Sequence, residues 1–518
     1  MTKRIEQLRE LKRVALLGGG EEKLAEQRAK GKTSGRDRVD RLLDPGSFVE
    51  HNLLAGGAAG ADGCVEGHGT IDGRRVCIYS QDPTVMGGSI GALHGNKMYN
   101  AVENALNMGV PLIGLHDSAG ARTVRVTEQK KPEPGEARQM GEKGGSSIFF
   151  INTQASGVVP QIGAVLGSCA GIAVYSPALH DFILMVDQTS HMFITGPRIV
   201  KSVMSEDLTM EQLGGARVHA QKSGVAHFRS KTEDDCLETI KRLLSFLPSN
   251  CRESPPRKEP TDDPDRMCDD LGEIVPSDPN KPFDMHRIVK SIADNGDFLE
   301  VHAEFAGEMI VGYLRLDGYP VGIVANNPMV RAGSLTVDSS DKQARFMRTC
   351  DCFNVPLVFL VDTPAYMPGS FQEHSGIIRH GAKVLYALSE HTVPRIDVLI
   401  RKTYGGGNLG MGVTPGLGYH VNFSWPIHES GVMGAEQTVD LFYTKQLAEA
   451  ANPQELREKL IKDYRERMAN PFQGAATSTN TSDIIEPRET RQRLIKELSL
   501  LRLLKIERYP KRHGNIPL

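Results

Sequence analysis

The sequence predicts an α/β fold with two homologous domains in tandem. One helix-and-strand pattern occurs twice: Asp72-Gly73 recurs as Asp317-Gly318, and Asp117 recurs as Asp362. Both pairs lie 245 positions apart (317 − 72 and 362 − 117). In each copy a buried strand also leads into a glycine-rich loop. A repeat of domain length indicates two related domains and a site that they share.

Composition excludes several classes of function. The chain has 518 residues, of which 39% are hydrophobic and 24% charged, as in ordinary globular proteins. A net charge of −3 and 6% aromatic residues give no footprint for nucleic acid. The eight cysteines form no CxxC pair, so no metal site is expected, and scattered thiols suit a reducing cytoplasm. Charges interrupt the apolar residues at the start of the chain, so no signal peptide is expected.

Helix and strand signals alternate along the first half. Apolar residues recur at helical spacing near the start, and a turn signal at Asp72-Gly73 predicts a hairpin. Gly109 should end the next helix, just before a buried strand. The predicted elements are a helical pattern over 1–30 that breaks at Gly18-Gly19-Gly20, helices over 31–43 and 93–106, a hairpin over 69–80 and a strand over 110–115.

Two segments need separate interpretation. Residues 155–179 carry no charge, which is also a feature of membrane spans. Prolines and glycines inside this stretch favour a buried strand, a glycine loop and a helix start, so no membrane span is expected. Residues 125–143 are polar and contain two prolines, which predicts an exposed loop.

We expect a first domain over 1–250 and a second over 283–518. Prolines and charges crowd residues 251–282, which therefore read as an extended linker. The tail over 489–504 is amphipathic, and we expect it to pack on its own domain, with docking to a partner as the alternative.

The glycine loops are the strongest candidates for chemistry. Val159-Pro160 opens a strand that leads to Gly171, and Val393-Pro394 opens one that leads to Gly405–Gly407. Glycine after a strand lets backbone N–H groups converge on an oxygen, and a helix start adds positive potential. Such an arrangement is typical of an oxyanion hole. Two plain tight turns are the alternative, which the matching positions in both copies disfavour.

Side-chain catalysts are harder to find. Cys169 has no His implied beside it and suits a small buried residue, and His191 suits a hydrogen-bonded core histidine. Asp117 and Asp362 could be catalytic, but we favour caps of the loops that follow their strands. A site with two oxyanion holes and no evident base fits a reaction in which substrate or cofactor moves the proton.

At this point the sequence resembles the carboxyltransferase (β) subunits of biotin-dependent acyl-CoA carboxylases, a family that includes propionyl-, methylcrotonyl- and geranyl-CoA carboxylases. The resemblance covers essentially the whole chain and implies two crotonase-type domains. Acyl-CoA would lie against the first domain, and biotin against the second domain of a neighbouring subunit. The motifs that carry it are Gly31-Lys-Thr-Ser-Gly-Arg-Asp-Arg-Val-Asp-Arg-Leu-Leu-Asp-Pro-Gly-Ser-Phe, Asp187-Gln-Thr-Ser-His-Met-Phe-Ile-Thr-Gly-Pro, Lys222-Ser-Gly-Val-Ala-His, Ile377-Ile-Arg-His-Gly-Ala-Lys and Lys511-Arg-His-Gly-Asn-Ile-Pro-Leu.

The resemblance also implies a mechanism and its residues. Carboxybiotin would release carbon dioxide, its ureido nitrogen would remove the α-proton, and the thioester enolate would attack the carbon dioxide. Gly171 and Ile172 would hold the enolate oxygen through their N–H groups, and Gly406 and Gly407 the ureido oxygen of biotin. The substrate-binding residues would be Ala119, Gly120, Ala170 and Leu409.

Three positions depart from the propionyl-CoA pattern. Ile172 replaces the second glycine of Cys-Ala-Gly-Gly, and Ala119 replaces a glycine of Asp-Ser-Gly-Gly-Ala-Arg. Leu409 stands where that pattern has an aspartate beside the acyl pocket. The Gly-Asn-x-Gly-Met form of this loop looks more like the methylcrotonyl and geranyl branch, so the sequence does not name the acyl group.

Partners follow from what the chain lacks. It has no Glu-Ala-Met-Lys-Met-like biotinylation segment and no nucleotide-binding loop. A biotin carboxyl carrier protein and a biotin carboxylase are therefore expected as separate subunits. The resemblance suggests a cytoplasmic hexamer, a trimer of dimers. The alternatives are a biotin-dependent decarboxylase running the same chemistry in reverse, on glutaconyl- or methylmalonyl-CoA for example, and a biotin-independent hydratase or isomerase of the crotonase type.

Overall fold

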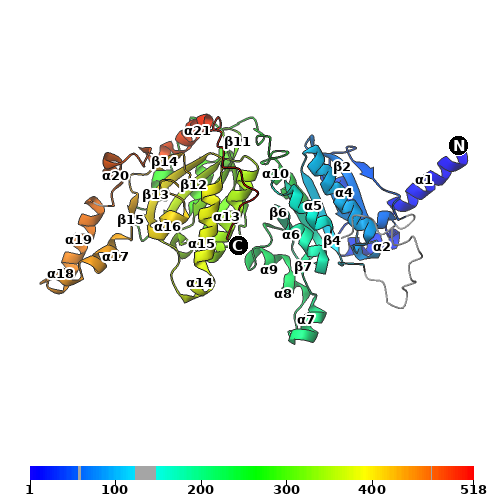
Figure 1. The fold of residues 1–518 in the computed structure, drawn as a ribbon, viewed down its shortest axis with the longest axis horizontal. Coiled ribbons are helices and arrows are strands. Elements are labelled where there is room, and N and C mark those ends of the chain that lie inside the picture. Colours follow the sequence, from blue (N-terminus) through cyan, green and yellow to red (C-terminus); the bar gives the residue numbers. More distant parts are fainter. Residues whose placement is uncertain (57–59, 123–146, 468, 518) are drawn as a thin grey trace. The chain divides into compact units, whose positions relative to one another are not determined.

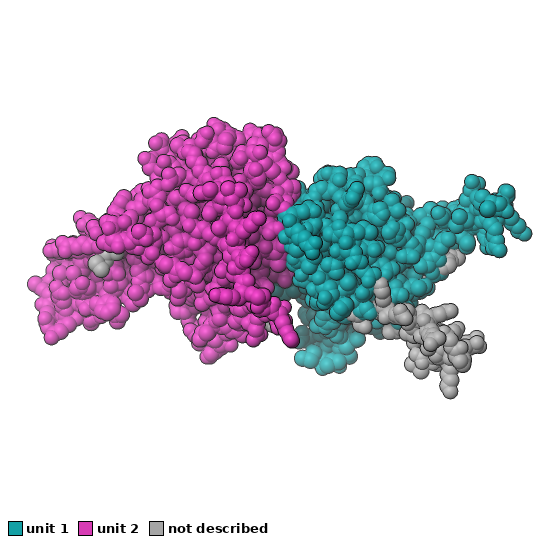
Figure 2. Space-filling model, turned by 45° about the horizontal axis from the view of Figure 1, so that its top comes forward, with its two compact units in different colours: residues 1–253 teal, residues 254–518 magenta. Residues whose placement is uncertain are grey.

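A computed structural model describes residues 1–56, 60–122, 147–467 and 469–517. The predicted loop over 125–143 lies outside these residues. The chain divides into two compact units, residues 1–253 and 254–518, which Figure 2 colours separately.

Each unit is built on one mixed sheet. In the first unit the strand order is β1-β2-β3-β4-β5-β6-β8, and β7 pairs with the end of β5. An antiparallel hairpin, β2-β3, forms one side, and β3, β4, β5 and β6 run parallel. The strands are β1 Val49–His51, β2 Cys64–Ile71, β3 Arg74–Gln81, β4 Leu112–Ser118, β5 Gln161–Ala170, β6 Phe182–Val186, β7 His191–Phe193 and β8 Phe228–Ser230.

The second unit repeats this topology. Its order is β9-β10-β11-β12-β13-β14-β16, and β15 pairs with the end of β13. The strands are β9 Phe298–Val301, β10 Met309–Leu316, β11 Tyr319–Asn326, β12 Leu357–Thr363, β13 Arg395–Tyr404, β14 Val421–Ser424, β15 Glu429–Gly431 and β16 Asp483–Ile484.

The central strands of the two sheets match at fixed sequence offsets. β2, β3 and β4 are each 245 positions before β10, β11 and β12 (309 − 64, 319 − 74 and 357 − 112). From β5 to β13 the offset falls to 234 (395 − 161), because the first unit has 11 more residues between its strands β4 and β5 than the second has between β12 and β13. The predicted duplication is therefore present in the backbone, and equivalent positions can be assigned by these offsets.

Both hairpins turn through the predicted Asp-Gly pairs. Asp72 and Gly73 have φ of 49° and 76°, and Asp317 and Gly318 have φ of 52° and 75°. Two successive left-handed residues form the type I′ turn that matches the twist of a hairpin.

Helices cover the sheets on both faces (Figure 1). α4 ends at Gly109, which has a left-handed φ of 65°, as the sequence predicts. Its buried Met98, Ala101 and Val102 pack with Cys77 of β3. The helices of the first unit are α1 Thr2–Leu16, α2 Glu21–Ala29, α3 Gly35–Leu42, α4 Ala92–Met108, α5 Ser147–Ala155, α6 Tyr175–Ala178, α7 Pro197–Met204, α8 Met210–Gly214, α9 Ala216–Gln221 and α10 Glu233–Leu244.

In the second unit, α13 and α15 lie side by side over the sheet (Figure 1). The helices are α11 Leu271–Ile274, α12 Met285–Ile292, α13 Val337–Cys352, α14 Ser370–His374, α15 Ile377–Glu390, α16 Gly405–Gly410, α17 Ala435–Phe442, α18 Thr444–Ala448, α19 Pro453–Arg467, α20 Pro471–Thr477 and α21 Thr490–Leu501.

Three predicted segments have a definite place in these layers. Residues 155–179 form β5, a glycine turn and α6, as expected. Leu271 and Ile274, which belong to the predicted linker, are buried in the core of the second unit. The tail helix α21 packs on its own unit, because Leu494 and Leu498 enter the same core. None of the helices within the described ranges has the length and hydropathy needed to cross a bilayer.

Candidate active site

Two parallel strands end in the same way, one in each unit. β5 ends before Gly171, which has φ of +58°, and β13 ends before Gly405, which has φ of +46°. The two glycines are 234 positions apart, the same offset as their strands (405 − 171). An L-residue is strained in this left-handed conformation, so glycine permits the sharp turn. The amides that follow lie in a first helical turn and have no intrahelical acceptor.

In the first unit the turn is surrounded by small residues. A Cβ on Gly120 would lie 2.7 Å from the carbonyl oxygen of Ala170, so the backbones approach closely there. Ala119 donates its N–H to Gly87 O at 3.0 Å beside this contact. The structure thus brings Ala119, Gly120, Ala170 and Gly171 to one edge of the sheet. Ile172 follows in the short 3₁₀ helix Gly171–Val174.

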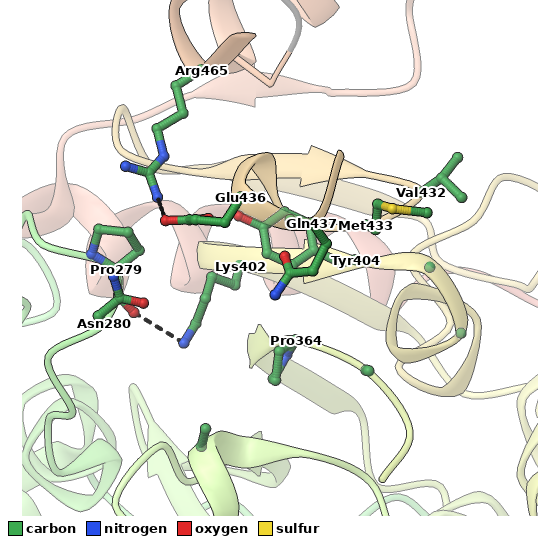
Figure 3. A pocket seen from close by; sticks show the side chains of 15 residues that line it. Pro279, Asn280, Pro364, Lys402, Tyr404, Val432, Met433, Glu436, Gln437 and Arg465 are labelled. Atoms are coloured by element: carbon green, nitrogen blue, oxygen red, sulfur yellow. Dashed lines mark hydrogen bonds and ion pairs between the residues drawn. The ribbon is translucent and has the colours of Figure 1, made fainter. Parts of the chain in front are cut away.

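The corresponding edge of the second unit opens into a cavity of about 440 Å³ (Figure 3). The strand offsets place Pro364, Ala365 and Tyr404 at the positions of Ala119, Gly120 and Ala170. All three line this cavity, together with Gly405 and Gly406. The edge of the sheet that is predicted to bind substrate in the first unit therefore corresponds to a cavity in the second unit.

Most charges in this cavity are paired. Arg465 contacts Glu436 at 2.6 Å and Glu429 at 3.3 Å, and Tyr404 donates its hydroxyl to Glu429 at 2.7 Å. The ion pair of Arg465 with Glu436 is drawn in Figure 3. Burial and the neighbouring Glu429 raise the pKa of Tyr404, which keeps its hydroxyl protonated as a donor.

Lys402 differs from Arg465 in its partner, which is a backbone carbonyl group. Its Nζ donates to the carbonyl oxygen of Pro279 at 3.2 Å (Figure 3). Among the residues that the structure describes, no carboxylate lies within 4.0 Å of this ammonium group. Burial lowers the pKa of Lys402 below its ordinary value, while Asp362 and Glu429 act in the opposite direction.

A second cavity of about 400 Å³ shares Gly406 with the first. Its lining is largely apolar and includes Ile377, Ile378 and Leu409, a residue that is 44% exposed. The predicted residues Gly406 and Leu409 are thus brought together. Gly407 is buried instead, and a Cβ there would lie 3.0 Å from Thr363 Cγ2.

Asp117 and Asp362 bind buried guanidinium groups, and within the described ranges neither carboxylate accepts a hydrogen bond from the loop that follows its strand, so the expected caps are not found there. Asp117 contacts Arg38 at 3.0 Å, and Asp362 contacts Arg401 at 2.9 Å. Arg401 lies on β13, and its equivalent on β5 is Gly167 (401 − 167 = 234). The equivalent carboxylates of the two units are therefore paired with arginines from different elements, α3 in the first unit and β13 in the second.

The remaining side-chain candidates do not supply a base. Cys169 is fully buried, and burial raises the pKa of its thiol to about 12. His191 lies 3.3 Å from Glu211, and burial lowers the pKa of its ring. Both residues are accounted for by packing and pairing, as the sequence indicates.

Sequence reasoning missed the polar residues of the larger cavity. Lys402 is two residues before Tyr404 on β13, so strand alternation could have placed both on one face. Glu436 and Arg465 come from α17 and α19, and nothing local in the sequence connects these helices with the glycine turn.

The duplicated sheets and their paired glycine turns define an α/β protein of the crotonase-like class, with two compact units of the same topology. Comparison with known proteins then identifies the family. The family model for the carboxyl transferase domain matches residues 26–516, so the chain belongs to the carboxyl transferase family and is a carboxyltransferase subunit of the acyl-CoA carboxylase type.

Two curated relatives match along their full lengths. The chain is 47% identical to a propionyl-CoA carboxylase carboxyltransferase subunit of Haloferax mediterranei, with 100% of both chains covered. It is 42% identical to the methylmalonyl-CoA decarboxylase subunit alpha of Propionigenium modestum, with 100% of this chain and 99% of the relative covered.

A solved structure has the same fold. The transcarboxylase 12S crystal structure, a hexamer with methylmalonyl-coenzyme A bound, superposes with a TM-score of 0.92 at 41% identity, over 100% of this chain and 98% of that one. These relatives are named for propionyl- and methylmalonyl-CoA, not for the methylcrotonyl and geranyl branch that the loop around Leu409 suggested.

Proposed function

We propose that this chain transfers a carboxyl group from carboxybiotin, borne by a separate carrier protein, to the α-carbon of a short acyl-CoA such as propionyl-CoA. The observation that carries the proposal is the pair of glycine turns at equivalent strand ends, Gly171 and Gly405. Relatives named for propionyl-CoA and methylmalonyl-CoA support the acyl group.

In the first unit the main chain would act on the thioester. The N–H groups of Gly171 and Ile172 would donate to the thioester oxygen as the enolate forms. Fixed donors in a site of low dielectric stabilise such an oxyanion without reorganising during the reaction. The side chain of Ile172 leaves its N–H in place, so the replacement of glycine does not remove a donor.

In the second unit the main chain would act on biotin. The hollow beside Gly405 and Gly406 has room for a small polar ring, and no Cβ projects from either glycine. When bound, carboxybiotin supplies the carbon dioxide and the nitrogen that accepts the α-proton. The predicted donors to its ureido oxygen are Gly406 and Gly407, and the strand offset adds Gly405 as the equivalent of Gly171.

The acyl group of a thioester held by the first unit would extend toward the apolar cavity around Leu409 in the second unit of a neighbouring subunit. Its lining of Ile377 and Ile378 suits a short hydrocarbon chain, and the one charged residue of its described lining is the acidic Glu373. Ala119, Gly120 and Ala170 would border the thioester on the first unit. Binding of acyl-CoA and biotin to different units suits an assembly of several subunits, and the hexamer of transcarboxylase 12S supports that state here.

The reverse direction is a second candidate. The full-length match to a methylmalonyl-CoA decarboxylase subunit favours it, because the same amides would stabilise the same enolate during decarboxylation. The physiological partner then decides the direction: a biotin carboxylase for carboxylation, or a subunit that consumes carboxybiotin for decarboxylation.

The test is turnover by the purified chain with a carboxylated biotin carrier protein and a panel of acyl-CoA thioesters. We expect carboxylated product with propionyl-CoA, and none when the carrier is uncarboxylated. Gly406→Val should reduce kcat with little change in the melting temperature. Absence of turnover with every acyl-CoA, or turnover without biotin, would overturn the proposal.

A further inference from the structure

We propose that Lys402 is an anion contact in the larger cavity, where its ammonium group binds the carboxylate that carboxybiotin carries. This inference rests on the proposed function and assigns a side chain to a site otherwise built from main-chain amides. Lys402 would then be a binding residue that distinguishes carboxylated from uncarboxylated biotin.

The position of Lys402 supports this role. It lines the same cavity as Gly405 and Gly406, and it comes from the strand that ends at this turn. Figure 3 shows its side chain extending from the strand toward Pro279 and Asn280, where the dashed line marks the bond to the Pro279 carbonyl oxygen. Its side chain is therefore fixed by β13 at one end and by the Pro279 carbonyl at the other.

The charges around the cavity point to an anionic ligand. The other cation in the lining, Arg465, already contacts Glu436 and Glu429. Lys402 contacts a neutral carbonyl oxygen, and Asp362, Glu429 and Glu436 act on it only from beyond 4.0 Å, so its ammonium group can take a direct contact from an anionic ligand. A partly buried ammonium group that contacts no carboxylate of the described ranges is stabilised by a ligand carboxylate.

The equivalent strand end in the first unit can be compared with that of Lys402 in the second. The β5 residue equivalent to Lys402 is Ser168 (402 − 168 = 234), and the neighbouring Ala170 is equivalent to Tyr404. A thioester that binds there is neutral before reaction, whereas carboxybiotin is an anion. The difference between Ser168 and Lys402 therefore matches the difference in ligand charge.

The apolar cavity is the poorer place for the carboxylate. Its charged lining residue is Glu373, which repels an anion, and its remaining lining includes Ile377 and Leu409. Gly406 borders both cavities, so a ring held at this turn could place its carboxylate on the Lys402 side and leave the acyl group on the Leu409 side.

Kinetics with three variants test the contact. Lys402→Met should raise KM for the carboxylated carrier roughly 10- to 100-fold, the loss of one charge-assisted hydrogen bond, and leave KM for propionyl-CoA within about twofold. Lys402→Arg should recover most of the loss. Lys462→Met removes a lysine whose side chain is 75% exposed and serves as the matched control, with both constants unchanged.

Lysine footprinting supplies a readout other than turnover. Acetylation of the wild-type chain followed by peptide mass spectrometry should show Lys402 protected by free biotin carboxylated on its ring, and much less by uncarboxylated biotin at the same concentration. Lys462 labelling should not change. This measurement needs no substituted protein, so it stands even where Lys402→Met does not fold.

The outcomes separate the two proposals. Normal wild-type turnover with an unchanged KM in Lys402→Met, or equal protection by both forms of biotin, overturns the Lys402 contact alone. Failure of the wild-type chain to turn over any acyl-CoA overturns the proposed function and this contact with it.

Discussion

Gly167→Ala should break a buried ion pair without changing any charge. A Cβ at Gly167 would overlap all three carboxylate atoms of Asp117. Asp117 would have to leave Arg38, whose side chain is fully buried, and Lys32, which it contacts at 2.6 Å. Because the overlap involves the carboxylate itself, a small rotation of Asp117 cannot relieve it and preserve both contacts.

The expected cost follows from the burial of this cluster. Removing one partner of a buried ion pair costs about 3–5 kcal/mol, and the remaining contact of Arg38 with Glu233 at 2.6 Å favours the lower end. For a unit of this size, about 3 kcal/mol lowers the melting temperature by roughly 6–12 °C. Thermal unfolding followed by circular dichroism measures this shift.

Two comparisons make the test specific. Gly272→Ala is the same substitution in α11, where a Cβ would meet no atom within 4 Å, and it should be neutral or stabilising by up to about 1 kcal/mol. In an Asp117→Ala background, Gly167→Ala should cost little, because the overlapping group is gone. A melting temperature of Gly167→Ala equal to wild type, or costs that simply add in the double variant, would refute the reasoning.

Three further changes have defined outcomes. Gly405→Ala should destabilise the chain more than Gly171→Ala. The added Cβ at 405 would lie 2.6 Å from the carbonyl oxygen of Val432, whereas at 171 the nearest atom would lie 3.8 Å away. Melting curves of the two variants measure the difference. Burial raises the pKa of Glu66 to about 7, above its value in the unfolded chain, so the folded state loses stability as pH rises from about 4.5 to 7. Glu66→Gln removes this penalty and should stabilise the fold by up to about 3 kcal/mol at pH 8. The same variant should leave the melting temperature near pH 4.5 unchanged. Leu409→Asp should lower kcat/KM for longer apolar acyl groups roughly tenfold more than for acetyl-CoA in a substrate panel, and an unchanged preference would place the acyl group elsewhere.

Much of the fold could be predicted because its signals are local. The turn at Asp72-Gly73 needs two left-handed residues, and Asp-Gly supplies them. Gly109 ends α4 for the same steric reason. The duplication was visible because the hairpin, helix and strand keep one offset of 245 from β2 to β4. The burial of Leu271 could not be foreseen, because proline-rich composition indicates an extended chain and says nothing about which core lies beside it.

The candidate site was predictable only in its main chain. A glycine after a strand can be read from the sequence, and the structure gives Gly171 and Gly405 the left-handed conformation that such turns require. The side chains of the larger cavity come from segments far apart in the sequence, so their meeting depends on tertiary structure. Arg465 on α19 and Lys402 on β13 reach one hollow with no shared motif.

The two units use the same strand position in different ways, which fits the proposal that they bind ligands of different charge. Asp117 and Asp362 occupy the same strand position, yet one is neutralised by Arg38 from α3 and the other by Arg401 from the adjacent strand. Gly167 makes the first arrangement possible, since a side chain there would displace the carboxylate. With the guanidinium supplied from α3, the end of β5 stays small and uncharged, which suits a neutral thioester. In the second unit the guanidinium group comes from Arg401 on β13 and pairs with Asp362, and the ammonium group of the next residue, Lys402, lies at the cavity.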